Sequence, residues 1–140
     1  MARTGFYVQT KDKEIQSHAL EIVERYRQGC TYTFGQALCQ CMEETKTTIA
    51  TLSARTGISE RQIGRMRTDE AKEIGFRTII GICVALKLTR DTAEKLLNFK
   101  RYTLNCNELY AELCKLFLDK DITVSECNVL LEALHLEPLT

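Results

Sequence analysis

Residues 59–67 gather side chains that can recognise a polar ligand. Arg61 and Arg65 are four residues apart, so they share one face if the segment is helical. A guanidinium group can donate two hydrogen bonds at once to O6 and N7 of guanine, which gives roughly 1 to 3 kcal/mol of discrimination between bases. Glu60 could accept from cytosine N4, pair with Arg61, or favour the positive end of a helix. The outward polar residues are Glu60, Arg61, Gln62, Arg65 and Arg67.

A plainer interpretation is that these cations only solvate a short exposed helix. Short solvent faces usually mix acidic and basic residues. Here Glu60 is the only acid, and it stands beside four basic residues, Arg55, Arg61, Arg65 and Arg67. The composition of the segment therefore favours a binding face, and the solvating role stays open.

Two short helices joined by a tight turn are expected to position this face. Thr48 is placed to cap the first helix, and Ser59 to cap the second. Gly57 stands where the first helix must end in a left-handed backbone conformation, which glycine adopts without steric cost. The residues that we expect to turn inward are Ile49, Leu52, Ile63 and Met66. This order predicts a helix-turn-helix.

The flanking sequence is helical in pattern throughout, and no stretch alternates with the period of a strand. Thr33 and Thr89 are expected to cap two further helices. Gly81, inside another expected helix, is interpreted as a close-packing point. The additional helices are expected at 11–28, 34–44, 76–86 and 90–97. In the first of these, one face carries Ile15, Ala19, Ile22, Val23 and Tyr26, which fits either a dimerisation arm or a packing helix.

The last 36 residues predict an antiparallel pair of helices. Asn105 or Asn107 is expected to cap the first helix, and Thr123 with Glu126 has the spacing of a capping box at the second. The residues expected to face inward are Leu109, Tyr110, Leu113, Leu116, Phe117, Cys127, Leu130, Leu131 and Leu134. The predicted organisation is an N-terminal arm and helix (1–29), a helix-turn-helix domain (30–104) and a C-terminal helical hairpin packed on it (105–140).

Charge is distributed unevenly although the formal net charge is zero. Residues 30–104 carry twelve Lys and Arg against eight Asp and Glu, a balance of +4. Residues 105–140 carry two Lys against seven acids, a balance of −5. A mildly basic middle with an acidic end suits a phosphate-facing module joined to a segment that does not bind phosphate, although ordinary scatter of surface charge would also explain it.

The remaining composition argues against several classes of protein. The seven cysteines are odd in number and several fall on apolar helical positions, so we interpret them as buried reduced thiols of a cytoplasmic protein. Cys39 and Cys41 lack a zinc-ligand spacing, and the two histidines are far apart, so we expect no metal, no cofactor and no enzymatic activity. No apolar run approaches the roughly 18 residues that span a bilayer, so no membrane partner is expected.

From Phe34 to Leu97 the order and length of the expected helices resemble the Cro/repressor-type helix-turn-helix family, also called Xre-like. The matching segments are FGQALCQCMEE, IATLSARTGIS, ERQIGRMR and FRTIIGICVALKLT. The resemblance implies a five-helix core. Together with the extra N-terminal helix and the C-terminal helical hairpin that the flanking patterns predict, the expected fold is all-α. It also implies that residues 59–67 enter the major groove of double-stranded DNA. The predicted DNA-binding residues are Thr48, Ser59, Glu60, Arg61, Gln62, Arg65 and Arg67.

Two residues and one loop depart from the family pattern. Ile49 stands where the family has a glutamine braced against phosphate, and Arg67 stands where it has an acid. The loop that follows the DNA backbone contains Asp69, Glu70 and Glu73 against a single Lys72. Acids beside phosphates repel, so we expect weak binding or binding assisted by a partner.

The leading hypothesis is a sequence-specific DNA-binding transcriptional regulator of a bacterium, phage or mobile element, acting as a homodimer on double-stranded DNA. The alternative is a protein-interaction module on the same fold, such as an antitoxin, an antirepressor or a nucleic-acid-mimicking inhibitor. That module would use the acidic C-terminal segment to bind a protein partner.

Overall fold

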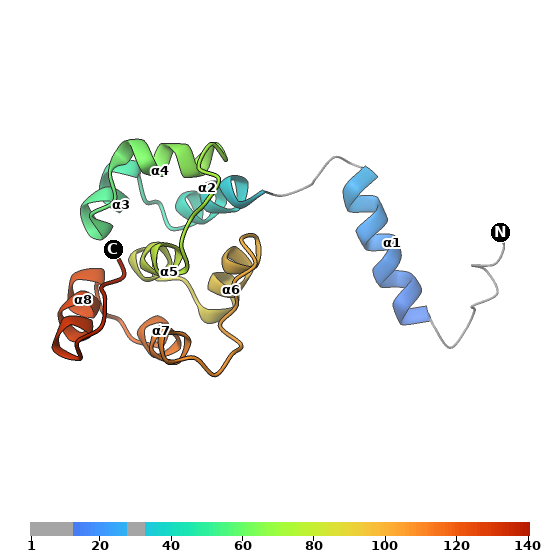
Figure 1. Cartoon of the computed structure of the whole chain (residues 1–140). Coiled ribbons are helices and arrows are strands. Elements are labelled where there is room, and N and C mark those ends of the chain that lie inside the picture. Colours follow the sequence, from blue (N-terminus) through green and yellow to red (C-terminus); the bar gives the residue numbers. More distant parts are fainter. Residues whose placement is uncertain (1–12, 28–32) are drawn as a thin grey trace. The chain divides into compact units, whose positions relative to one another are not determined.

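The computed structural model describes residues 13–27 and 33–140, and every regular element in those ranges is an α-helix. The chain divides into two compact units, 1–32 and 33–140. The first unit holds α1 (Lys13–Arg27) (Figure 1). The second holds α2 (Phe34–Glu44), α3 (Ile49–Thr56), α4 (Glu60–Arg67), α5 (Phe76–Ala85), α6 (Arg90–Asn98), α7 (Leu109–Asp119) and α8 (Val124–Ala133). The predicted all-α class is therefore confirmed.

Helix α5 is the centre of the second unit. It packs against α3, α6, α7 and α8, and Figure 1 shows it surrounded by them. Because α5 is enclosed by its neighbours, it buries more than one face. The buried residues of α5 are Ile79, Ile80, Gly81, Ile82, Cys83, Val84 and Ala85. Gly81 is the close-packing point that the sequence suggests, since a Cβ there would lie 2.7 Å from Cγ2 of Thr140.

Hydroxyl side chains start most of the helices where the sequence places them. Thr33, Thr48, Ser59, Thr89 and Thr123 each accept a hydrogen bond from a backbone N–H in the first turn of the helix that follows. Each such cap contributes about 1 kcal/mol by satisfying a donor that has no partner inside the helix. These caps fix the boundaries of the elements that carry the candidate site.

The expected cap of α7 was wrong. Neither Asn105 nor Asn107 precedes the helix, which begins at Leu109 after Glu108 and has no side-chain cap. The reason is that the preceding segment is held on α6: the backbone N–H of Leu104 donates to a carboxylate oxygen of Glu94 at 2.7 Å, and Leu104 is buried. The chain therefore follows α6 further before it turns into α7.

The expected inward faces of α7 and α8 were also partly wrong. Leu109, Leu116, Leu130 and Leu134 are exposed, with 60% of Leu109 accessible to solvent. Phe117, Cys127 and Leu131 are buried as expected, and the other buried residues of these helices are Ala111, Cys114 and Val124. Helix α7 packs on α5 and α6, while α8 packs on α3 and α5. The faces that α7 and α8 bury therefore depend on the helices they pack against, and not on the helical period alone.

The six cysteines in the described ranges are all free, and four of them, Cys41, Cys83, Cys114 and Cys127, are buried. Burial raises the pKa of Cys127 to about 11 and that of Cys114 to about 12, so these thiols stay protonated at neutral pH. Cys30 lies outside the described residues. None of the described helices combines the length and the apolar character needed to cross a membrane.

Candidate nucleic-acid interface

The turn between α3 and α4 is held by hydrogen bonds on both sides of Gly57. Gly57 has φ of 81°, and its N–H donates to the carbonyl of Ser53 at 2.8 Å. The hydroxyl of Ser53 donates to the carbonyl of Ile58 at 2.6 Å, while Thr56 Oγ1 accepts from the Ile58 N–H at 3.1 Å. Sequence reasoning missed these two hydroxyls, although two hydroxyl residues shortly before a turn glycine are a usable signal. The turn fixes the angle at which α4 leaves α3.

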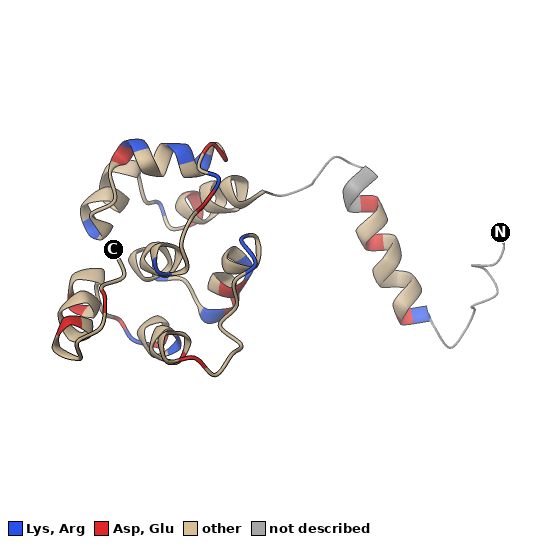
Figure 2. Ribbon diagram, in the orientation of Figure 1, with Lys and Arg blue, Asp and Glu red and all other residues tan. Residues whose placement is uncertain are grey.

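Helix α4 lies on α2 and α3 through two apolar side chains. Ile63 and Met66 are buried, as the sequence predicts, and Ser59 Oγ accepts from the N–H of Gln62 at 3.2 Å. Figure 2 shows the basic residues of α4 at the edge of the second unit, with one acidic residue at the start of the helix. The helix therefore has a packed side and a charged outer side.

Four of the predicted site residues are brought together on the outer side of α4. Glu60, Arg61, Gln62 and Arg65 are all exposed. Within the described part of the chain, their side chains make no hydrogen bond or ion pair, so Glu60 does not neutralise Arg61. Both guanidinium groups are thus available to an external acceptor.

Arg67 is placed differently from the other arginines. It is half-buried, and its Nε donates to Sγ of Cys39 on α2 at 3.3 Å. The thiol of Cys39 in turn approaches the carbonyl of Arg67 at 3.8 Å. Arg67 therefore helps to join α4 to α2 instead of extending the outer face.

Thr48 lies at the exposed start of α3. Its hydroxyl accepts from the N–H of Thr51 at 3.1 Å and lies 2.9 Å from the Thr51 hydroxyl. Its own backbone N–H has no acceptor within the described ranges. A free N–H at a helix start can bind an anion, because the positive end of the helix dipole adds to the hydrogen bond.

Asp69, which the sequence placed in a repulsive acidic loop, faces the protein. The backbone of Asp69 has φ of 63°, a left-handed conformation that aspartate tolerates better than most residues. One carboxylate oxygen accepts from the hydroxyl of Thr33 at 2.6 Å, and the other from the N–H of Gly35 at 2.8 Å. Gly35 permits this approach, because a Cβ there would lie 2.5 Å from the carbonyl oxygen of Arg67. Asp69 therefore caps α2, and Glu70 and Glu73 are the exposed acids of the loop.

We expect Asp69→Ala to destabilise the second unit by about 1 to 3 kcal/mol, because it removes the acceptor of two hydrogen bonds, one of them from a helix-start N–H. Thermal unfolding would measure the loss, and Asp69→Asn should restore part of it. The matched variant Glu70→Gln with Glu73→Gln should leave the unfolding midpoint nearly unchanged. It should also raise DNA affinity several-fold at low salt. A gain in DNA affinity from Asp69→Ala without loss of stability would contradict this assignment.

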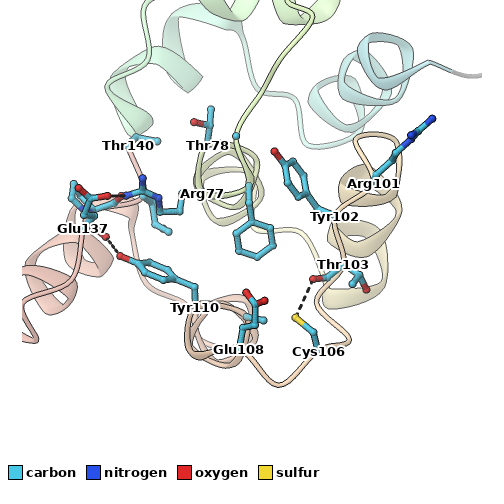
Figure 3. A pocket seen from close by; sticks show the side chains of 15 residues that line it. Arg77, Thr78, Arg101, Tyr102, Thr103, Cys106, Glu108, Tyr110, Glu137 and Thr140 are labelled. Atoms are coloured by element: carbon cyan, nitrogen blue, oxygen red, sulfur yellow. Dashed lines mark hydrogen bonds and ion pairs between the residues drawn. The ribbon is translucent and has the colours of Figure 1, made fainter.

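A pocket of about 830 Å³ lies away from α4, between the start of α5, the α6–α7 connection, α7 and the C-terminal residues (Figure 3). Arg77 pairs with Glu137 at 3.0 Å and lies 5.8 Å from the centre of the Tyr110 ring. The hydroxyl of Tyr110 donates to the backbone carbonyl of Glu137. These polar groups satisfy one another, so their described contacts hold the C-terminal residues against α5 and α7.

Comparison with known proteins finds a match in the segment that contains the outer face of α4. Residues 37–91 match the family of Cro/C1-type HTH DNA-binding domains. The match begins within α2, includes α3, α4 and α5, and ends in the first residues of α6. No curated protein and no solved structure matches the chain. Residues 37–91 are therefore similar to helix-turn-helix DNA-binding domains of the Cro/C1 type, as the resemblance in the sequence implies.

Proposed function

We propose that this protein is a sequence-specific DNA-binding transcriptional regulator of a bacterium, phage or mobile element, and that it binds double-stranded DNA as a homodimer. The observation that carries the proposal is the outer face of α4, where Arg61 and Arg65 are exposed and have no partner in the described chain. In this proposal residues 30–104 form the DNA-binding domain, residues 1–29 an arm, and residues 105–140 a segment packed on the domain.

The dimensions and chemistry of α4 support insertion into the major groove. An α-helix with its side chains is about 10 to 12 Å in diameter, which fits the roughly 12 Å width of the major groove. Arg61 and Arg65 would each donate two hydrogen bonds to a guanine, and Glu60 would accept from a cytosine. Gln62, beside them, would contact an adenine or the edge of the site. Sequence preference would come from these four side chains.

Contacts to phosphate would set the orientation of the helix. The free N–H of Thr48 at the start of α3 is suited to a phosphate oxygen. Ser59 would contribute by fixing the first turn of α4 through its cap, and Arg67 by holding α4 on α2. Because Asp69 caps α2, the loop repels phosphate less than its composition suggests.

Selection from a pool of random duplexes, followed by a gel-shift titration at two salt concentrations, would test the proposal. We expect an enriched site with two similar halves whose centres are about 34 Å apart, one turn of DNA. Affinity should fall as salt rises, because phosphate contacts release counterions. The proposal would be abandoned if no sequence were enriched and binding did not depend on salt.

A second candidate function is a protein-interaction module, favoured by the −5 balance of residues 105–140 and by the exposed leucines on α7 and α8. Its test is a pull-down that returns one protein in stoichiometric amount and loses it when Glu108 and Glu132 are changed to glutamine. Both are exposed. Asp119 is unsuitable for this test because it accepts two hydrogen bonds from Arg90. A salt-dependent DNA complex formed without a protein partner would count against this candidate.

A further inference from the structure

Helix α1 carries an apolar face that is exposed within its own unit. Every side chain from Lys13 to Glu24 is exposed, and 67% of Ile15 is accessible to solvent. Ile15, Ala19, Ile22 and Val23 follow one another at intervals of four, three and one, so they lie on one side of the helix. Leu20 is also exposed but projects from a different side.

A helix of this kind needs a partner to be stable in water. An isolated helix shorter than about 12 to 15 residues is marginal even with favourable residues, and most helical stability in proteins comes from packing of an apolar face. Helix α1 has 15 residues and is the only helix described in its unit. Burial of Ile15 and Ile22 would contribute roughly 1.5 to 3 kcal/mol for each side chain.

The spacing and charge of α1 favour a second copy of itself as the partner. Ile15, Ala19 and Ile22 alternate steps of four and three residues, the pattern of a seam between two paired helices. The helix contains three basic and three acidic residues, Lys13, Arg25, Arg27, Glu14, Glu21 and Glu24, so two copies approach without net repulsion. The exposed leucines of α7 and α8 are a poorer surface for self-association, because each copy would bring a segment with a balance of −5.

Chain geometry is compatible with this pairing on DNA. Five residues, 28–32, separate α1 from the cap of α2, and a fully extended chain of that length spans at most about 18 Å. Two such segments reach at most about 36 Å, which is comparable to the distance of about 34 Å expected between recognition helices. The paired surface extends over only two helical turns, and such a short contact is small compared with a stable interface, which buries roughly 1,000 Å². Pairing through α1 alone is therefore weak, and two DNA-bound copies would strengthen it through their high effective concentration.

We propose that α1 is a self-association helix that pairs through Ile15, Ala19 and Ile22 with the same face of a second copy. In solution the pair forms at high protein concentration. On DNA it makes binding to two adjacent half-sites cooperative, a part of the inference that rests on the proposed function. The self-association in solution does not depend on DNA binding and can be measured without it.

Sedimentation equilibrium of the full chain from about 1 to 500 µM tests the pairing directly. We expect the unaltered protein to shift from monomer to dimer in this range, and Ile15→Asp with Ile22→Asp to stay monomeric. Leu20→Asp is the matched control, since it places the same charge on the same helix outside the paired face. Val129→Asp, at an exposed position on α8, should also leave the dimer intact.

The proposal is overturned if the double variant dimerises like the unaltered protein, if the Leu20 or Val129 variant loses the dimer, or if no dimer forms at any concentration. On a selected DNA site, the double variant should bind a single half-site with unchanged affinity and lose at least about tenfold on two half-sites. If dimers form through Ile15 and Ile22 but no DNA site is selected, the proposed function fails and the role of α1 stands.

Discussion

Replacing Arg61 and Arg65 together with alanine is expected to weaken binding to the selected DNA site by about 30-fold to 20,000-fold. Each arginine can donate two hydrogen bonds to a guanine, and each such contact gives roughly 1 to 3 kcal/mol of discrimination. The combined loss of about 2 to 6 kcal/mol corresponds to this range, since 1.4 kcal/mol is tenfold in affinity. A gel-shift titration on the selected duplex would measure it.

The fold should survive this change. Both side chains are exposed and have no partner in the described chain, so the free energy of unfolding should change by less than about 0.5 kcal/mol. Alanine is also a good helix former, which keeps α4 intact. The matched control is Lys95→Ala with Lys120→Ala, which removes the same charge from exposed positions outside α4. A similar loss of affinity in the control would mean that net charge, and not base reading, governs binding.

The core of the domain was predictable because its signals are local. Hydroxyl residues stand immediately before α2, α3, α4 and α6, and Gly57 marks the end of α3, so each boundary depends on a few neighbouring residues. The apolar spacing within α4 selects Ile63 and Met66 as the buried pair, and the structure agrees. The same pattern leaves Glu60, Arg61, Gln62 and Arg65 on the outside, where the structure places them.

The remaining features depend on contacts between distant residues. Asp69 binds Thr33 across 36 positions, and Arg67 binds Cys39 across 28 positions, so no local pattern reveals that either faces the protein. The same limit explains the C-terminal helices. Periodicity identifies two amphipathic helices and places Phe117, Cys127 and Leu131 inward, as observed. It does not show that α7 buries Ala111 and Cys114 while Leu109 is exposed, because that choice depends on the surface of α5.

Replacing Ile63 with alanine is expected to destabilise the second unit by about 2 to 5 kcal/mol. Ile63 has no exposed surface, and its side chain lies on the inner side of α4 in a close-packed core. Truncation therefore removes buried methyl groups and leaves a cavity. For a domain of this size the unfolding midpoint should fall by about 10 °C or more. Calorimetry or circular dichroism would measure the shift, and Ile63→Val should lose only about 0.5 to 1.5 kcal/mol.

Val129→Ala is the matched control, because it also shortens a branched side chain but at a site that is 70% exposed. It should change stability by no more than about 0.5 kcal/mol. An equal loss at Val129, or no loss at Ile63, would contradict the packing described for α4. Comparison with the arginine pair separates support from recognition: the arginine variant should lose affinity at unchanged midpoint. The Ile63 variant should unfold at a lower temperature. Below its unfolding midpoint, its DNA affinity should fall mainly in proportion to the fraction of protein that is unfolded.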